Sequence, residues 1–181
     1  MRRAYKYFCL IVYYSFAQWL PSSYQPMGGV GKWLRYRLVK VIFKKCGKNV
    51  TVERRVQFGS GRGITIGDNS GLGVNAVVPN NIQIGRDVMM GPDCYFLSVN
   101  HKFDSTDIPM WKQGYTLPQH PTIIEDNVWI GRQVTATPGR HISSGTVIGA
   151  CCLLCKDFPQ NSIVGGNPSK LIRSRVDESN G

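Results

Sequence analysis

The chain has 181 residues, of which 42% are hydrophobic and 18% charged, so it is long enough for one folded domain and too apolar for a disordered polymer. Its 22 Lys and Arg residues against 11 Asp and Glu give a net charge of +11. Ten of the basic residues and none of the acidic ones lie in residues 1–48, which leaves the rest close to neutral. This distribution disfavours a nucleic-acid-binding protein with a basic surface throughout.

An apolar and aromatic run occupies residues 7–20 of the basic segment. At about 1.5 Å per residue, a helix of this length is shorter than a hydrocarbon core of about 30 Å, so we expect no transmembrane anchor. Ser15 and Gln18 interrupt the run and no small-x-small cleavage site follows it, so we also expect no signal peptide. The six Cys residues lack the spacing of a disulfide framework, which favours reduced thiols in a cytoplasmic protein.

The chain repeats every six residues from Ile66 to His101, and again from Ile124. In these hexads the first place is apolar, the second is often Gly, and the fifth is mostly small or β-branched. The fifth-place spacing continues backwards through Val52, Phe58 and Ile64, which indicates a degenerate start near Lys48. A period of six fits neither a helix nor an amphipathic strand, and it predicts short strands separated by identical bends.

Such a chain must coil. Parallel strands of successive coils would pair at about 4.8 Å, with the first- and fifth-place side chains buried in a central core. The second-place glycines fall where the chain turns a corner, which suits a residue without a Cβ.

These hexads resemble the repeat of the hexapeptide-repeat acyltransferases, and the resemblance covers about residues 48–175. It implies a left-handed parallel β-helix with three hexads per coil, assembled as a homotrimer with active sites between neighbouring subunits. We therefore predict an all-β solenoid with a basic, partly helical N-terminal extension at 1–47, a β-helix domain at 48–175, an inserted loop at 102–121 and a polar tail at 176–181.

The inserted loop carries several large apolar residues, among them Trp111, which favour burial against another surface. His101 stands at its entrance. On composition alone it would be a surface histidine, but its place resembles that of the general base in galactoside, maltose and colanic-acid acetyltransferases. A neutral imidazole, with a reference pKa of about 6.5, can accept a proton from an attacking alcohol. Asp104, three residues later, could orient the imidazole or be merely solvated.

The resemblance implies further contacts. Asn75 and Trp129 match acceptor-contacting positions, although the spacing at Asn75 differs by two residues and Trp129 could instead pack on an outer face. The closing segment, with Lys-Asp-Phe-Pro and Gly-Asn-Pro, resembles the part of the family that binds coenzyme A. Matching by residue gives donor contacts at Arg132, Ala150, Cys155, Lys156 and Arg173. Cys155 replaces the usual hydroxyl residue, and Lys156 and Arg173 suit phosphates.

The sequence thus predicts an O-acetyltransferase that moves acetyl from acetyl-CoA directly to a hydroxyl of a sugar or surface-polysaccharide precursor. The alternatives are acetylation of a xenobiotic hydroxyl or an amino-sugar amine, or a noncatalytic β-solenoid scaffold. The three His residues are too widely spaced to predict a metal site. The basic N-terminal segment would either pack on the trimer or contact an anionic membrane at its inner face.

Overall fold

The computed structural model describes residues 2–116 and 120–176. It is a left-handed parallel β-helix of about six turns with helices at its N-terminal end, so the predicted fold class is confirmed. Of the polar tail predicted at 176–181, only Val176 lies within the described residues. Residues 117–119 of the predicted loop lie outside them as well.

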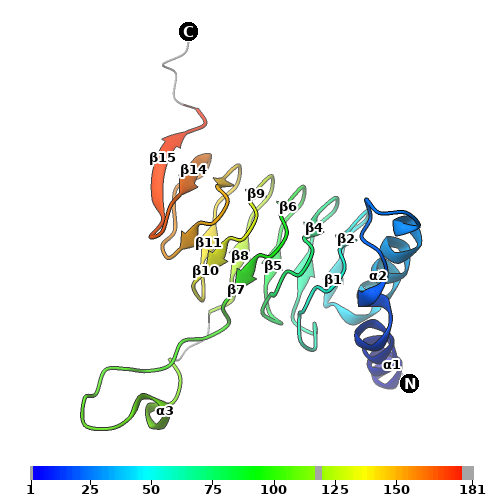
Figure 1. The fold of residues 1–181 in the computed structure, drawn as a ribbon, viewed down its shortest axis with the longest axis horizontal. Coiled ribbons are helices and arrows are strands. Elements are labelled where there is room, and N and C mark those ends of the chain that lie inside the picture. The colour runs from blue at the N-terminus through cyan, green and yellow to red at the C-terminus, as the bar shows by residue number, and fades with distance from the viewer. Residues whose placement is uncertain (1, 117–119, 177–181) are drawn as a thin grey trace.

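The strands stack on three faces (Figure 1). Face 1 contains β1 (Lys45–Cys46), β3 (Thr65–Ile66), β5 (Gln83–Ile84), β8 (Ile123–Ile124) and β11 (His141–Ile142). Face 2 contains β2 (Thr51–Val52), β4 (Gly71–Leu72), β6 (Met89–Met90), β9 (Trp129–Ile130), β12 (Val147–Ile148) and β14 (Ser162–Gly165), closed by the antiparallel strand β15 (Lys170–Ser174). Face 3 contains β7 (Tyr95–Phe96), β10 (Thr135–Ala136) and β13 (Leu153–Leu154), extended by single bridges at Gln57 and Val77.

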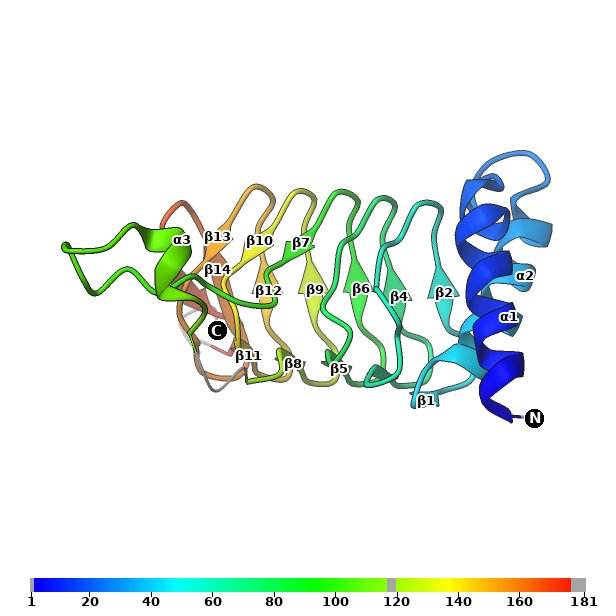
Figure 2. The same ribbon diagram turned by 90° about the horizontal axis from the view of Figure 1, so that it is seen from below.

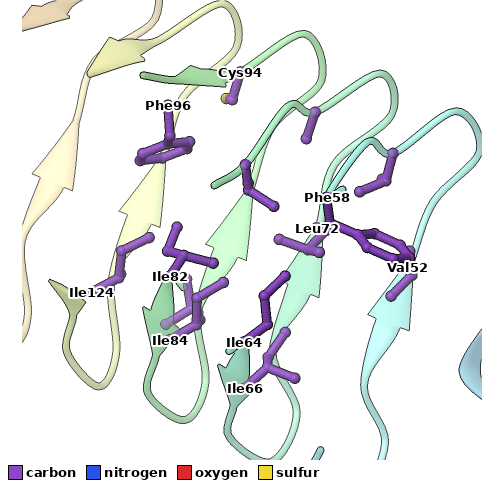
Figure 3. Close-up of a cluster of buried hydrophobic side chains, with 14 of the residues drawn as sticks. Val52, Phe58, Ile64, Ile66, Leu72, Ile82, Ile84, Cys94, Phe96 and Ile124 are labelled. Carbon is purple, nitrogen blue, oxygen red and sulfur yellow. The ribbon is translucent and has the colours of Figure 1, made fainter. Parts of the chain in front are cut away.

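The period of six explains the core. First-place residues such as Ile66 and Leu72, and fifth-place residues such as Ile82, point into the coil and are buried (Figure 3). The fifth-place residues Phe58 and Ile64, which precede the regular hexads, are also buried. The repeat predicts that these two places are buried, and the small exposed fraction of these side chains confirms it.

The corners depend on the fourth place of the hexad, which the sequence pattern did not single out. Asn69, Asn75, Asp87 and Asp93 all have φ between 57° and 61°. Asn and Asp tolerate this left-handed backbone better than most residues because their short side chains hydrogen-bond locally. Glycine is needed at the second place for a different reason, because a side chain there would collide with the next coil. A Cβ on Gly67 would lie 2.6 Å from a backbone carbon of that coil. These glycines let successive coils approach closely.

Two helices close the N-terminal end of the solenoid (Figures 1 and 2). They are α1 (Arg2–Ser15) and α2 (Gly28–Ile42), linked through the short 3-10 helix η1 (Ala17–Trp19). The buried Tyr13 hydroxyl donates to the Val56 carbonyl at 3.0 Å, which ties α1 to the first coil. We call residues 2–42 the helical cap. The basic segment thus packs, in part, on its own solenoid.

Arg35 of α2 is the largest fully buried side chain of the cap. Its guanidinium donates to the carbonyls of Val52 at 2.6 Å and Ala17 at 3.2 Å, and to two further carbonyls of the η1 segment. Glu53 lies 3.8 Å away and accepts a hydrogen bond from the backbone of Ser23. Burial lowers the pKa of Arg35, while Glu53 opposes that effect. Arg35 therefore joins the cap to the solenoid.

Candidate functional site

The inserted segment leaves the solenoid after β7 as a projecting arm, which we define as residues 99–116 (Figures 1 and 2). The two ends of the arm meet at its base, where the Thr116 backbone donates to the Asn100 carbonyl at 2.9 Å and the Lys102 backbone to the Gly114 carbonyl at 3.0 Å. Farther out lies the short helix α3 (Met110–Gln113). The Gln113 side chain bonds to Ser105 and so closes the outer turn of the arm. Hydrogen bonds within the arm therefore set its shape.

His101 lies in this base. It forms an isolated antiparallel bridge with Tyr115, and their ring centroids are 4.4 Å apart. The imidazole is exposed and has no hydrogen-bond partner among residues 2–116 and 120–176. Asp104 is exposed and makes no hydrogen bond to His101 in the described part of the chain. Tyr115, rather than Asp104, is thus the residue that restrains the His101 ring.

Two open hollows flank the base of the arm, at the corner between faces 3 and 1, which we call the arm corner. One has a volume of about 200 Å³ and is lined by Ser98, Val99, Asn100, Thr116, His120, Pro138, Gly139 and Arg140. The other, about 330 Å³, is on the side of the preceding coil and shares Ser98. A ligand in the first hollow would lie against the residue that precedes His101.

Arg140 was not anticipated as a lining residue. It occupies a fifth place, where the repeat normally puts an apolar side chain, and this break in the pattern was the available signal. Instead of entering the core, its guanidinium donates to the Cys155 carbonyl at 3.1 Å and pairs with Asp157 at 3.3 Å. The first hollow is therefore lined in part by an arginine whose charge is paired with Asp157.

The next corner, between faces 2 and 3, holds a second group of predicted site residues, and we call it the Arg132 corner. Asn75, Asp93 and Arg132 follow one another there on successive coils. Asn75 donates to Asp93 at 2.7 Å, and Arg132 pairs with the other oxygen of that carboxylate at 3.2 Å. The hydrogen bond from Asn75, with that from Arg132, holds the pKa of Asp93 below its ordinary value. Ala150 stands on the following coil, where its neighbour Cys151 bonds to the Arg132 carbonyl.

The remaining predicted residues are distributed over the C-terminal coils. Trp129 is on β9 of face 2, with 53% of its surface exposed. Cys155 and Lys156 follow β13 at the arm corner, and Arg173 is on β15. Contact with Ser169 at 3.4 Å lowers the pKa of the Cys155 thiol.

The predicted residues therefore form two groups. His101, Cys155 and Lys156 share the arm corner, whereas Asn75, Arg132 and Ala150 share the Arg132 corner, with face 3 between them. Trp129 and Arg173 are on face 2. One copy of the chain does not bring all of these side chains together.

The described residues also contain no group of three or more His, Cys, Asp or Glu side chains that could hold a metal ion. Among them, no helix combines the length and apolarity needed to cross a membrane.

No protein-family model matches the chain. Individual proteins do. It is 33% identical over 141 residues to the galactoside O-acetyltransferase of Escherichia coli K12, an alignment that covers 77% of this chain and 68% of the relative. It is 30% identical to the putative colanic acid biosynthesis acetyltransferase WcaF of the same organism, over 77% of this chain and 74% of that protein.

A solved structure agrees with these relatives. The hexapeptide-repeat acetyltransferase of Vibrio cholerae in complex with acetyl-coenzyme A superposes with a TM-score of 0.70 and 31% identity, over 79% of this chain and 77% of that one. Sequence and structure agree with the resemblance drawn from the hexads, and the chain belongs to the hexapeptide-repeat acetyltransferase family.

Proposed function

We propose that the protein transfers the acetyl group of acetyl-CoA to a hydroxyl of a sugar or a surface-polysaccharide precursor. The observation that carries the proposal is the exposed imidazole of His101 at the base of the arm, where the preceding residue, Asn100, lines an open hollow of about 200 Å³. The names of its relatives support the acceptor class, since one is a galactoside O-acetyltransferase and another is a putative acetyltransferase of colanic acid biosynthesis. The acetyl-CoA complex of the Vibrio cholerae protein supports the donor.

The reaction needs one general base. His101 would take the proton of the acceptor hydroxyl as the oxygen attacks the thioester carbonyl. The carbon–sulfur bond then breaks, and the thiolate of coenzyme A recovers the proton from the imidazolium. The tilted contact of the Tyr115 ring with the His101 ring, at 4.4 Å between centroids, would limit the positions that the imidazole can adopt.

We infer that donor and acceptor meet between two subunits of a homotrimer. The arm corner of one copy would supply His101, and the Arg132 corner of its neighbour would supply Arg132 and Ala150. This arrangement also explains the exposed apolar side chains of the arm, among them Trp111 at 74% and Met110 at 66% exposed. Such side chains usually mark a contact surface. Lys156 and Arg173 would face the phosphates of coenzyme A.

The chemistry is tested by following the release of free thiol from acetyl-CoA with a panel of sugars, glycan precursors, amino sugars and hydroxyl-bearing antibiotics. We expect release only with a hydroxyl-bearing sugar acceptor. His101→Ala should lower the rate by about 10²–10⁴-fold. His141→Gln is the matched control, because the His141 side chain is on face 1, bonds to Glu125 at 2.7 Å and lines neither hollow at the base of the arm.

Near-normal turnover in His101→Ala would exclude the proposed base. Acetylation of an amine in place of a hydroxyl would support an N-acetyltransferase, and acetylation of the antibiotic alone would support a xenobiotic acceptor. Absence of both donor binding and thiol release would favour a noncatalytic scaffold.

The shared site is tested by subunit complementation. Ala150→Trp adds bulk at the Arg132 corner, where Ala150 is exposed, and should abolish activity, as should His101→Ala. In a mixed trimer, one interface combines the native His101 of an Ala150→Trp subunit with the native Ala150 of a His101→Ala subunit. We therefore expect partial recovery of activity on mixing, whereas a site made within one subunit would give none.

A further inference from the structure

The helical cap leaves large apolar side chains exposed to solvent, and we call these side chains its apolar surface. On α1, Ala4, Phe8, Ile11 and Ser15 form an exposed stripe at helical spacing, with Phe8 at 60% and Ile11 at 65% exposed. The opposite stripe, with Cys9 and Tyr13, is buried. Helix α1 therefore has two apolar sides, and the solenoid covers only one of them.

The surface extends beyond α1. On α2, Val30 is 59% and Trp33 is 60% exposed, while Leu38 and Ile42 on the other side are buried. The segment that joins the helices adds four more large exposed side chains: Phe16, Trp19, Tyr24 and Met27. A patch of this kind on a folded protein marks an interaction site.

The positive charge of the cap indicates which kind of partner its apolar surface would bind. Exposed Arg37 and Lys40 continue the outward stripe of α2 beyond Trp33, and the Arg37 guanidinium lies 6.0 Å from the Trp33 ring centroid. Glu53 is the first acidic residue of the chain, and it is buried. Exposed aromatic side chains beside cations, without an acidic residue among them, match a surface of anionic lipid headgroups.

We propose that the helical cap docks the protein on an anionic lipid surface. Phe8, Ile11 and Trp33 enter the headgroup region, while Arg37 and Lys40 pair with lipid phosphates. The helices lie in the plane of the interface, as amphipathic helices with a basic polar edge do. The arm leaves the solenoid nearer its other end (Figure 2), so docking by the cap keeps the arm in water.

Vesicle co-sedimentation of the full chain tests this proposal, with phosphatidylcholine vesicles that either contain or lack phosphatidylglycerol. We expect binding to the anionic vesicles and weaker binding as salt is raised. Phe8→Gln with Ile11→Gln should lower the partition coefficient at least tenfold, because two apolar side chains no longer leave water. Removing a charge, as in Lys40→Gln, should lower it about fivefold on the anionic vesicles alone. Leu171→Gln, at an exposed apolar residue of β15, is the matched control and should bind normally.

Three results would overturn the proposal. They are the absence of binding to anionic vesicles, binding that neither cap variant reduces, and a lower oligomer mass for Phe8→Gln with Ile11→Gln in light scattering. The last would show that the face is a contact between copies of the chain. Circular dichroism melts of each variant establish that the cap is folded, and none of these measurements depends on acetyl transfer.

Discussion

Replacing Arg35 with Met should destabilise the protein by about 3–5 kcal/mol. Met keeps most of the length of the side chain and removes all of its donors. The bonds to Val52 and Ala17 are buried, and a hydrogen bond to a charged group contributes about 1.5–3 kcal/mol. The bonds to Leu20 and Pro21 are only partly buried, so water can replace the guanidinium there.

The buried carbonyls, rather than Glu53, should account for most of this loss. Glu53 is 3.8 Å from the guanidinium and keeps its bond to the Ser23 backbone, at 2.9 Å, when Arg35 is absent. We therefore expect Glu53→Gln to cost no more than about 1–2 kcal/mol. Arg35→Met should cost nearly as much in the Glu53→Gln background as in the native one.

Urea unfolding followed by circular dichroism gives the free energies, and amide hydrogen exchange locates the loss. Exchange should accelerate first in η1, α2 and β2, since Arg35 joins these elements. A loss below about 1 kcal/mol for Arg35→Met would refute the role of the carbonyl bonds. Equal losses for Arg35→Met and Glu53→Gln would assign the stability to the ion pair instead.

Three further changes test the coils and the donor site. Gly73→Ala would put a Cβ against a carbonyl oxygen of the next coil and should cost about 1–3 kcal/mol in urea unfolding, whereas Gly71→Ala, with its nearest neighbour at 3.7 Å, should fold normally. The hydrogen bond from Asn75 lowers the folded-state pKa of Asp93, so its stabilising contribution is present above about pH 4 and is lost as the pH falls through that folded pKa. Melting temperatures should therefore fall more steeply with acid in the native protein than in Asp93→Asn. Lys156→Gln should raise KM for acetyl-CoA about fivefold with little change in kcat, and an unchanged KM would remove Lys156 from the donor site.

The core could be predicted from the sequence because the hexad is a local pattern. Each first-place residue, such as Ile66 or Leu72, points inward because of its position within its own hexad and its packing against the adjacent coil. Counting hexads in threes would also have assigned Trp129 to face 2, since Ile130 begins the second hexad after the interruption. The family resemblance then supplied the hand of the coil, which the period leaves open.

The arm could not be predicted in the same way because its geometry depends on pairing between residues that carry no repeat. The bridge between His101 and Tyr115 joins residues 14 positions apart, and no periodicity marks either of them. The second-place glycines show a different limit. The pattern found them, but their need for space appears only once the neighbouring coil is in position.

The positive charge of the N-terminal segment has two distinct physical roles. Arg35 is buried, and its charged guanidinium donates hydrogen bonds to backbone carbonyls and so joins the cap to the first coil. Arg37 and Lys40, on the same helix, are exposed; Arg37 lies beside the exposed Trp33 ring, and the Lys40 ammonium lies over the half-buried Tyr36 ring. Because α2 presents these residues on opposite sides, the same helix can stabilise the fold and offer a cationic surface. Substitutions of Arg37 or Lys40 should therefore change lipid binding without the loss of stability that Arg35→Met causes.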